Sequence, residues 1–349
     1  KWHLGLGNAE KVDYAGTLRP GPVDHGFDRY FGIPASLDME PYVYIENERT
    51  AEQPTAKTPG QDKPRGVFWR PGPIAPGLKI EEVLPTLRDR AVSYLRERAR
   101  SPSEPFFLYL PLTGPHTPWV PKPEFQGKSG AGIYGDFVAQ VDDTLGAVMR
   151  TLDEAGLADN TILIYTSDNG AHWSPEDQEK YPHRANGTWR GMKADIHEAG
   201  HRVPFIVRWP GKARAGSVSD ATACLTDLMA TSAEIAGVRL PSEAGEDSFS
   251  FVPALTGGKT NRAAVVHHSM EGVFAIRAGD WKLVEGRGSG GFSAPVRVDV
   301  KSGEPAGELY NLRHDPGETQ NLYLMRPEIV AKLSALLERY RKDGRSRPA

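Results

Sequence analysis

The 349-residue sequence is long enough for one large domain and a smaller one, and its formal net charge is −3. Its 42 Lys and Arg are balanced by 45 Asp and Glu, so no basic footprint points to nucleic acid, and we expect no such partner. No apolar run approaches the length of a membrane span, and the single cysteine, Cys224, cannot form an intrachain disulfide.

The first 77 residues contain little that predicts regular structure. The chain opens with Lys1-Trp-His-Leu-Gly5, in which a Lys-x-His pair alone is weak evidence for a site. Residues 26–38 end in Ser36-Leu-Asp38, and a passage rich in proline and glycine then runs to about residue 77. Such a passage cannot hold long regular elements, so we expect it to form loops over the surface.

Residues 81–168 predict alternating helices and strands. Apolar residues at helical spacing predict amphipathic helices over residues 81–100 and 134–155. The stripe of the second helix consists of Val138, Val141, Leu145, Val148 and Leu152, and Gly156 follows as a C-cap. Apolar runs at residues 106–110 and 161–166 predict core strands. This succession predicts an α/β fold with a mostly parallel central sheet flanked by helices.

Polar residues follow both of these predicted strands. Asp168-Asn-Gly170 ends the second strand, at the sheet edge where α/β folds bind ligands. A carboxylate beside a carboxamide suits a hard cation such as calcium or magnesium, although the same tripeptide is a common turn sequence. After the first strand, prolines flank His116 and would hold it in place, either in a site or in a surface loop.

The segment at residues 191–202 is dense in titratable side chains. It contains Lys193, His197, His201 and Arg202, with glycines at its edges, and a strand is predicted at residues 203–210. Loops of this composition beside a sheet edge bind anions, and they also occur as plain solvated loops.

The character of the sequence changes near residue 258. A helix is predicted at residues 226–236, before Gly237. Short strands are predicted at residues 265–268, 273–277, 281–285 and 308–311, and a last amphipathic helix at 327–342. We therefore expect a catalytic α/β domain at residues 1–258 and a C-terminal subdomain at residues 259–349, in which a helix packs on a small antiparallel sheet.

Six motifs in this order resemble those of type I sulfatases of the arylsulfatase kind, within the alkaline-phosphatase superfamily. They are Lys1–Gly5, Pro115–Pro118, Asn160–Gly170, Gly191–Lys193 with Glu198–Pro204, Phe274–Leu283 and Leu309–Leu322. The resemblance runs from the first residue to the last helix. It implies a calcium-dependent hydrolase of sulfate esters, with magnesium less favoured. In such enzymes a cysteine or serine is oxidised to formylglycine, whose hydrated form attacks sulfur and releases an alcohol.

The resemblance also implies roles for the residues that match. Asp168 and Asn169 would be metal ligands, and Asp168 could help to deprotonate the nucleophile. Lys1 would contact the formylglycine and the sulfate. His3 would take a proton from the formylglycine hydrate so that sulfate is expelled.

Further matching residues would contact the substrate. His116 and Lys193 would bind sulfate oxygens, and one of them would protonate the leaving oxygen. Ser36 would lie near the sulfate, a weaker assignment. His197 and His201 could face the leaving alcohol, where several histidines would suit a carbohydrate or glycosaminoglycan sulfate rather than a simple aryl sulfate.

The nucleophile of such enzymes is missing from the matching region. The family places a Cys/Ser-x-Pro-x-Arg signature and two metal-binding aspartates ahead of the motif with which this sequence opens. Ser293-Ala-Pro-Val-Arg297 fits the signature but lies on the wrong side of every other site motif, and Cys224 does not fit. We therefore expect the C-terminal portion of a longer enzyme, inactive by itself, with part of its sheet missing and strand edges exposed.

Two other functions remain open at this stage. A phosphodiesterase or phosphonate hydrolase of the same superfamily would use a similar site on phosphorus. A non-catalytic protein that binds sulfated glycans would use the same cations as an anion site, but it would have no need for Asp168 and Asn169 together. The scarcity of cysteine favours a periplasmic or secreted bacterial protein over a lysosomal one.

Overall fold

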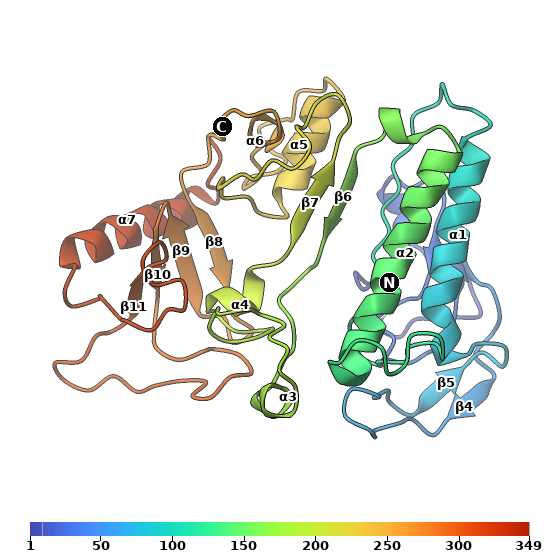
Figure 1. Ribbon diagram of the computed structural model, residues 1–349, viewed down its shortest axis with the longest axis horizontal. Coiled ribbons are helices and arrows are strands. Elements are labelled where there is room, and N and C mark those ends of the chain that lie inside the picture. Colours follow the sequence, from blue (N-terminus) through green and yellow to red (C-terminus); the bar gives the residue numbers. More distant parts are fainter. Residues whose placement is uncertain (9, 349) are drawn as a thin grey trace. The chain divides into compact units, whose positions relative to one another are not determined.

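The computed structural model describes residues 1–8 and 10–348. They form two compact units, unit 1 up to residue 158 and unit 2 from residue 159 onwards. Each unit has hydrophobic cores of its own and is described by itself (Figure 1). The domain boundary predicted after residue 258 falls inside unit 2. It stays a prediction, because compactness alone does not show which part of a chain folds independently.

Unit 1 combines short antiparallel strands with two long helices. Strands β1, β2 and β3 form one sheet in that order, and β4 pairs with β5 in another. The elements are η1 Pro22–His25, β1 Phe31–Gly32, β2 Ile45–Glu46, β3 Arg49–Thr50, β4 Ala56–Thr58, β5 Gly72–Ile74, η2 Ile80–Glu82, α1 Val83–Arg98 and α2 Gly132–Glu154. Helices α1 and α2 lie side by side (Figure 1), and both confirm the helices predicted from spacing.

Helix α2 shows how periodicity sets a buried face. Phe137 and Val141 are buried in one cluster with Leu84 of α1, and full burial of such side chains contributes roughly 1.5–3 kcal/mol each. Gly156 has a φ of 68°, which ends the helix as predicted. Val138, which was predicted in the buried stripe, is 36% exposed, because Phe137 one position earlier faces the core instead.

The proline- and glycine-rich passage before α1 is not confined to the surface, contrary to the prediction. It lacks long elements, but Tyr42, Val43 and Ile45 are at most 2% exposed and belong to the main core cluster of unit 1. Turn residues separate these apolar positions, so no period of a helix or strand marks them as core in the sequence.

Residues 106–110 do not form the predicted core strand. Phe107 and Tyr109 are 72% and 57% exposed, and both rings stack on Phe27, with centroids 6.2 and 6.4 Å away. Within the described part of the chain no strand pairs with this segment. A strand is defined by its ladder of backbone hydrogen bonds, so an apolar run without a partner strand does not become one.

Unit 2 contains a two-stranded ribbon, a four-stranded sheet and several helices. The elements that follow η3 Ala158–Asn160 are β6 Leu163–Thr166, α3 Pro175–Lys180, α4 Glu198–His201, β7 Phe205–Arg208, α5 Asp227–Ile235, α6 Val252–Leu255, β8 Val265–His268, β9 Phe274–Ala278, β10 Trp281–Val284, β11 Glu308–Asn311 and α7 Pro327–Asp343. Most lie within a few residues of their predicted positions, and the mixed α/β class is confirmed.

The strand pairing of β6 differs from the expectation. β6 pairs with β7 antiparallel, with Leu163 opposite Arg208 and Thr166 opposite Phe205. Every pair of named strands in the described residues is antiparallel, and one isolated parallel bridge joins Tyr42 to Ile74 of β5. The side chains of β6 are half-buried, whereas a strand of a parallel sheet covered by helices is buried on both faces. The predicted parallel pairing is therefore not seen here.

The predicted C-terminal sheet and helix are confirmed. The sheet has the order β11-β10-β9-β8, and α7 covers one of its faces (Figure 1). Ile276, Leu283 and Leu309 of the sheet pack with Leu333 and Leu337 of α7, all at most 2% exposed.

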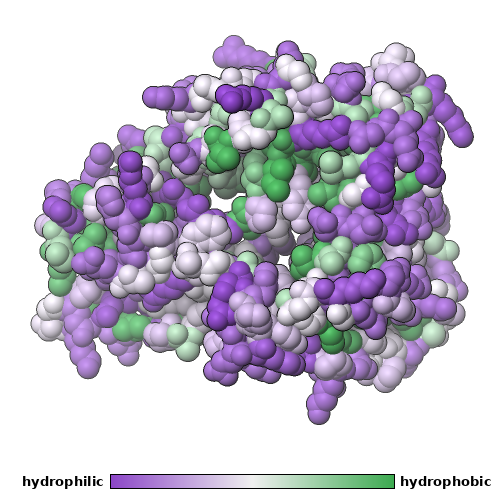
Figure 2. All heavy atoms as spheres, viewed as in Figure 1, coloured by the Kyte–Doolittle hydropathy of each residue, from purple (hydrophilic) through white to green (hydrophobic). Residues whose placement is uncertain are grey.

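Figure 2 shows mostly hydrophilic side chains on the face drawn, with hydrophobic ones among them. None of the helices in the described residues has the length and hydrophobicity of a membrane span.

Candidate active site

In unit 2, the predicted metal ligands lie at the carboxyl end of β6. Asp168 is exposed and Asn169 is half-buried. The Ser167 hydroxyl donates to the Asn169 carbonyl at 3.0 Å, and the Asn169 carboxamide donates to the Gly170 carbonyl at 3.0 Å. The turn is thus tied by its own side chains, with the Asp168 carboxylate on the outside.

Gly170 fixes this strand end against α4. Its N–H donates to the Gly200 carbonyl at 3.0 Å. A Cβ at position 170 would lie 1.7 Å from the Ala199 carbonyl oxygen, so no larger residue fits without moving the backbone. The glycine is therefore required by the close approach of two main chains.

Asn186 joins the strand end to the loop that carries Lys193. Its carboxamide accepts from the Ala171 N–H and donates to the Ala171 carbonyl, both at 3.0 Å. The N–H of Lys193 donates to the same carbonyl at 3.2 Å. The main chain of Lys193 is thereby bonded to Ala171, which follows Asn169 by two residues in the sequence. Nothing in the sequence marked Asn186 as a brace, because only its contacts distinguish it from other loop asparagines.

His197 is buried within unit 2 and contacts Glu308. The residue is 1% exposed, and its Nε2 lies 3.1 Å from a carboxylate oxygen of Glu308. Glu308 also accepts from the Gly288 N–H and the Tyr310 hydroxyl. Burial alone would raise the pKa of Glu308, but these hydrogen bonds outweigh burial and lower it. The predicted contact of His197 with the leaving alcohol is not supported by this placement.

His201 likewise belongs to a buried charge cluster. Its Nε2 lies 3.2 Å from the ammonium of Lys282, and its ring lies 3.7 Å from that of His267, centroid to centroid. Lys282 is 0% exposed and also contacts Glu318 at 2.8 Å and Glu198 at 3.2 Å. Burial and the Lys282 charge hold the pKa of His201 well below its ordinary value. A substrate contact by His201 is also not supported.

In unit 1, the opening motif runs beside the segment that leads to Ser36. The N–H of Trp2 donates to Ile33 at 3.0 Å, and that of His3 donates to Pro34 at 2.9 Å. His3 is exposed and has a φ of 60°, a left-handed conformation that few residues other than glycine adopt. Lys1 is half-buried.

Ser36 and His116 are in contact. The Ser36 hydroxyl lies 3.2 Å from Nδ1 of His116, and Ser36 is 2% exposed. The turn around His116 is fixed by the indole N–H of Trp119, which donates to the Pro115 carbonyl at 2.9 Å.

The predicted site residues are divided between the two units. Unit 1 carries Lys1, His3, Ser36 and His116. Unit 2 carries Asp168, Asn169 and Lys193.

The predicted metal ligands are of the type that binds a hard cation, but two of them are too few to hold one. Calcium takes about six to eight oxygen ligands. The side chains of Asp168 and Asn169 supply oxygens of the right type, but too few to complete such a site. Across the described residues, no cluster of three or more His, Cys, Asp or Glu could hold a metal ion.

Neither of the two residues that could be mistaken for a nucleophile has the setting of one. The Ser293 hydroxyl donates to the buried carboxylate of Asp195, which also accepts from the Ser293 N–H at 3.0 Å. Cys224 is half-buried and free. The exclusion of Ser293 thus has a structural reason beyond its position in the sequence.

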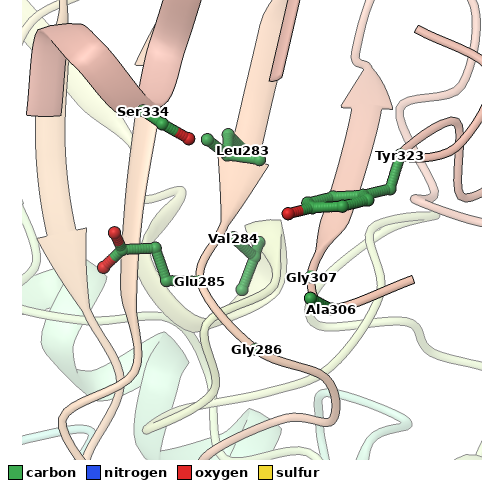
Figure 3. A pocket seen from close by; sticks show the side chains of 8 residues that line it. All are labelled: Leu283, Val284, Glu285, Gly286, Ala306, Gly307, Tyr323 and Ser334. Atoms are coloured by element: carbon green, nitrogen blue, oxygen red, sulfur yellow. The ribbon is translucent and has the colours of Figure 1, made fainter. Parts of the chain in front are cut away.

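A pocket of about 320 Å³ in unit 2 is lined by none of the candidate site residues. Figure 3 shows Tyr323 and Ser334 pointing towards Leu283 and Val284, and none of the 8 residues that line the pocket is cationic. The carboxylate of Glu285 at its edge is paired with Arg341. The lining residues therefore offer a sulfate group no positive charge, and the nearby Arg341 is already paired, so this pocket does not suit sulfate.

Comparison with known proteins decides the family. A sequence profile described as Sulfatase matches residues 1–238. The chain belongs to the sulfatase family. The resemblance to type I sulfatases of the alkaline-phosphatase superfamily is therefore confirmed, and with it the enzyme class, sulfuric ester hydrolases.

Individual sulfatases match over most of the chain. An N-acetylgalactosamine-6-O-sulfatase of Bacteroides thetaiotaomicron is 33% identical over 97% of this chain and 73% of its own length. Human arylsulfatase A is 32% identical over 92% of this chain and 63% of its own length. A solved structure that concerns metabolism of multiple glycosaminoglycans by Bacteroides thetaiotaomicron aligns with a TM-score of 0.84 and 32% identity, covering 98% of this chain and 78% of that one.

The chain covers a different fraction of the length of each related sulfatase. The chain spans 63% of arylsulfatase A and 50% of the human N-acetylgalactosamine-6-sulfatase, which is 30% identical to it.

Proposed function

We propose that this chain forms part of a calcium-dependent sulfatase that removes sulfate from carbohydrate or glycosaminoglycan substrates. The observation that carries the proposal is the match of the sulfatase profile to residues 1–238, together with a 33% identical relative named N-acetylgalactosamine-6-O-sulfatase. Aryl sulfates are the alternative substrates, since arylsulfatase A is nearly as similar, at 32% identity.

The cationic residues would bind the sulfate group. A transferring sulfuryl group spreads negative charge over its oxygens, and preorganised cations stabilise that charge. In this proposal Lys1, His116 and Lys193 contact the sulfate oxygens, and His3 takes a proton when sulfate is expelled. The brace of Asn186 on Ala171 supports the part assigned to Lys193, because it fixes the main chain from which that side chain extends.

Asp168 and Asn169 would hold the calcium ion, with further ligands from outside the described residues. Bound calcium would neutralise negative charge on the sulfuryl oxygens. The exposed carboxylate of Asp168 and the neighbouring carboxamide are oxygen donors, which supports calcium over softer metals. Magnesium is less favoured, because it demands a near-ideal octahedral site.

The formylglycine nucleophile would come from sequence outside these 349 residues. The internal signature at Ser293–Arg297 is unsuited, since the Ser293 hydroxyl is bonded to Asp195. Formylglycine would supply the group that attacks sulfur, and the residues of this chain would bind, orient and exchange protons around it.

The test is sulfate release by the natural full-length protein, produced together with a formylglycine-generating enzyme. We expect hydrolysis of N-acetylgalactosamine 6-sulfate and a loss of at least about 10²-fold in kcat/KM in Lys193→Ala. Lys301→Ala, an exposed lysine of the same unit, serves as the control and should retain activity. Turnover of phosphodiesters or phosphonates but not sulfate esters would favour the other superfamily reaction. Binding of sulfated glycans without turnover would favour the non-catalytic protein.

Calcium binding can be measured without activity. Isothermal titration of the full-length protein should show calcium binding that Asp168→Asn weakens, while Asp159→Asn, in η3 before β6, should bind as the parent does. Equal binding by the Asp168→Asn variant would remove Asp168 from the ligand set.

The cellular location is part of the proposal. A periplasmic or secreted location would suit an enzyme that acts on polymeric glycans, and lysosomal targeting is the alternative. Fractionation of the producing cells, with activity measured in each fraction, tests the location directly.

A further inference from the structure

A buried carboxylate in unit 1 has one oxygen without a hydrogen-bond partner. Asp38 is 5% exposed, and its Oδ2 accepts from Nη1 of Arg70 at 2.7 Å. Its Oδ1 is buried and makes no hydrogen bond within the described residues. A buried polar atom without a partner costs stability, so its persistence calls for a reason.

The position of Asp38 is rigidly determined. The Asp38 carbonyl accepts from the Arg70 N–H and the Arg70 guanidinium, both at 3.1 Å, and from the Tyr42 hydroxyl at 3.2 Å. Tyr42 is 2% exposed in the core of the unit. The unpartnered oxygen therefore follows from a braced main chain and not from a mobile side chain.

His116 faces this oxygen. Its Nδ1 lies 4.0 Å from Oδ1 of Asp38, and 27% of the His116 side chain is exposed. Nδ1 also lies 2.8 Å from the Thr117 carbonyl and 3.2 Å from the Ser36 hydroxyl. A carbonyl oxygen can only accept, so Nδ1 carries a hydrogen, and the nitrogen that gains or loses a proton is Nε2.

The same three residue types occur in the catalytic triad of serine hydrolases, but the geometry here differs. In such a triad the serine and the carboxylate contact opposite ring nitrogens. Here Ser36 and Asp38 both face Nδ1. Ser36 is also 2% exposed, too buried to attack a substrate. A nucleophilic Ser36 is therefore excluded.

We propose that Asp38 is a positioning residue that makes His116 the general acid of the reaction. The Asp38 carboxylate stabilises the imidazolium form and, with Thr117 and Ser36, holds the ring through Nδ1, so that Nε2 is the nitrogen that donates the proton. As the bond between sulfur and the leaving oxygen breaks, the Nε2 proton passes to that oxygen and the alcohol departs. Neutral imidazole then regains a proton from water. This inference rests on the proposed sulfatase function and assigns its acid to His116 rather than to Lys193.

The groups that set the charge around Nδ1 can be varied separately. Asp38 supplies the negative charge, while Arg70 lies on the far oxygen of the same carboxylate and partly offsets that charge. Ser36 and Thr117 add neutral oxygens. Removing the Asp38 charge and removing the Arg70 charge should therefore act on His116 in opposite directions.

The first test compares leaving groups in the full-length enzyme. A general acid matters most for a poor leaving group, such as a sugar alkoxide, and least for a good one, such as nitrophenolate. We expect Asp38→Asn to lower kcat/KM by about 10²-fold on the sugar sulfate and to change it little on nitrophenyl sulfate. Asp89→Asn, an exposed carboxylate of the same unit, should leave both rates unchanged.

The outcomes separate the possible roles. Equal losses on both substrates would overturn the proposal, because a structural role gives no dependence on the leaving group. Unchanged rates would overturn it as well. A parent enzyme that hydrolyses no sulfate ester would instead refute the proposed function.

A second test needs no turnover. In an NMR titration of the full-length protein, the pH at which His116 protonates should fall by about one unit in Asp38→Asn and rise in Arg70→Gln. The remaining histidines serve as internal references. Identical His116 titrations in the parent and both variants would overturn the proposal even if the enzyme is inactive. Because the Arg70→Gln variant keeps the Asp38 carboxylate, it also covers the case in which Asp38→Asn does not fold.

Discussion

The polar cluster around Lys282 in unit 2 and the one around Asp38 in unit 1 both bury charge, but they satisfy it differently. The Lys282 ammonium donates to Ile196 and is surrounded by two glutamates and His201. Asp38 has one oxygen paired with Arg70 and the other facing a half-exposed histidine. A buried charge that is fully surrounded fixes local structure, whereas one that lacks a partner can act on a neighbouring group.

The largest effect should come from removing Lys282 from its buried cluster. Lys282→Met leaves the carboxylates of Glu198 and Glu318 buried with less positive charge, and we expect a loss of about 3–5 kcal/mol in the free energy of unfolding. Adding Glu318→Gln should recover part of this loss. Arg297→Met, which breaks an exposed pair with Glu271, should cost less than about 1 kcal/mol. Denaturant unfolding measures all three. A loss no larger than that of the surface pair would mean that Lys282 does not balance the buried charges of Glu198 and Glu318.

The second effect concerns the attachment of this cluster to the end of β6. Gly170→Ala would force a Cβ against the Ala199 carbonyl, and we expect a destabilisation of about 3 kcal/mol or more. Gly317→Ala is the matched control in the same unit, because its Cβ would lie 3.4 Å from the Thr188 carbonyl, an ordinary contact. Similar melting temperatures for the two variants would contradict the close approach.

A smaller effect is expected at His197. His197→Ala removes a hydrogen bond from the buried Glu308 and should cost about 1–3 kcal/mol. Because the side chain is turned into unit 2, hydrolysis of sugar and aryl sulfates should fall in equal proportion. A selective loss on sugar sulfates would restore the substrate role expected from sequence. By contrast, Asp38→Asn should discriminate between the same two substrates.

The smallest effect is a change in the pH dependence of stability. Burial, with the charge of Lys282, lowers the pKa values of His201 and His267 well below 6.5. The unfolded chain then binds more protons, so stability should fall as the pH drops below about 6.5. The pKa values of Glu198 and Glu308 are also lowered, which adds a further loss below about 4.5.

His267→Phe tests this dependence. The variant should lose less stability than the parent between pH 6.5 and 5, because one titrating group is gone. His268→Phe, at the exposed next position of β8, should behave as the parent does. Melting temperatures recorded across this range check the difference, and parallel curves for the parent and the His267→Phe variant would contradict it.

The helices, one helix end and the C-terminal sheet could be predicted from the sequence, because nearby residues determine them. The helices at residues 83–98 and 132–154, the stop at Gly156 and the C-terminal sheet all follow from periodicity and turn residues. Asp168, Asn169 and Lys193 were found as motif residues, and in the structure the main chain of Lys193 is bonded to that of Ala171, two residues after Asn169.

Features that depend on distant partners could not be predicted. The antiparallel pairing of β6 with β7 and the missing strand at residues 106–110 depend on which backbone lies alongside. The inward orientation of His197 requires Glu308, which is 111 residues away. In the sequence Asp38 is only the end of the segment before the predicted loops; the structure shows that one of its oxygens is buried without a hydrogen bond and lies 4.0 Å from His116.

The brace of Asn186 on Ala171 has a consequence for how the protein should be produced. Asn186-Gly-Thr188 is also an acceptor sequence for N-linked glycosylation. A eukaryotic secretory host attaches the oligosaccharide to Nδ2 before the chain has folded, and this nitrogen is the one that donates to Ala171. Sugar at this position would hold the Lys193 loop away from the end of β6. Bacterial expression, or Thr188→Ala in a secretory host, should give protein with the loop docked, which intact-mass measurement and melting temperature together would verify.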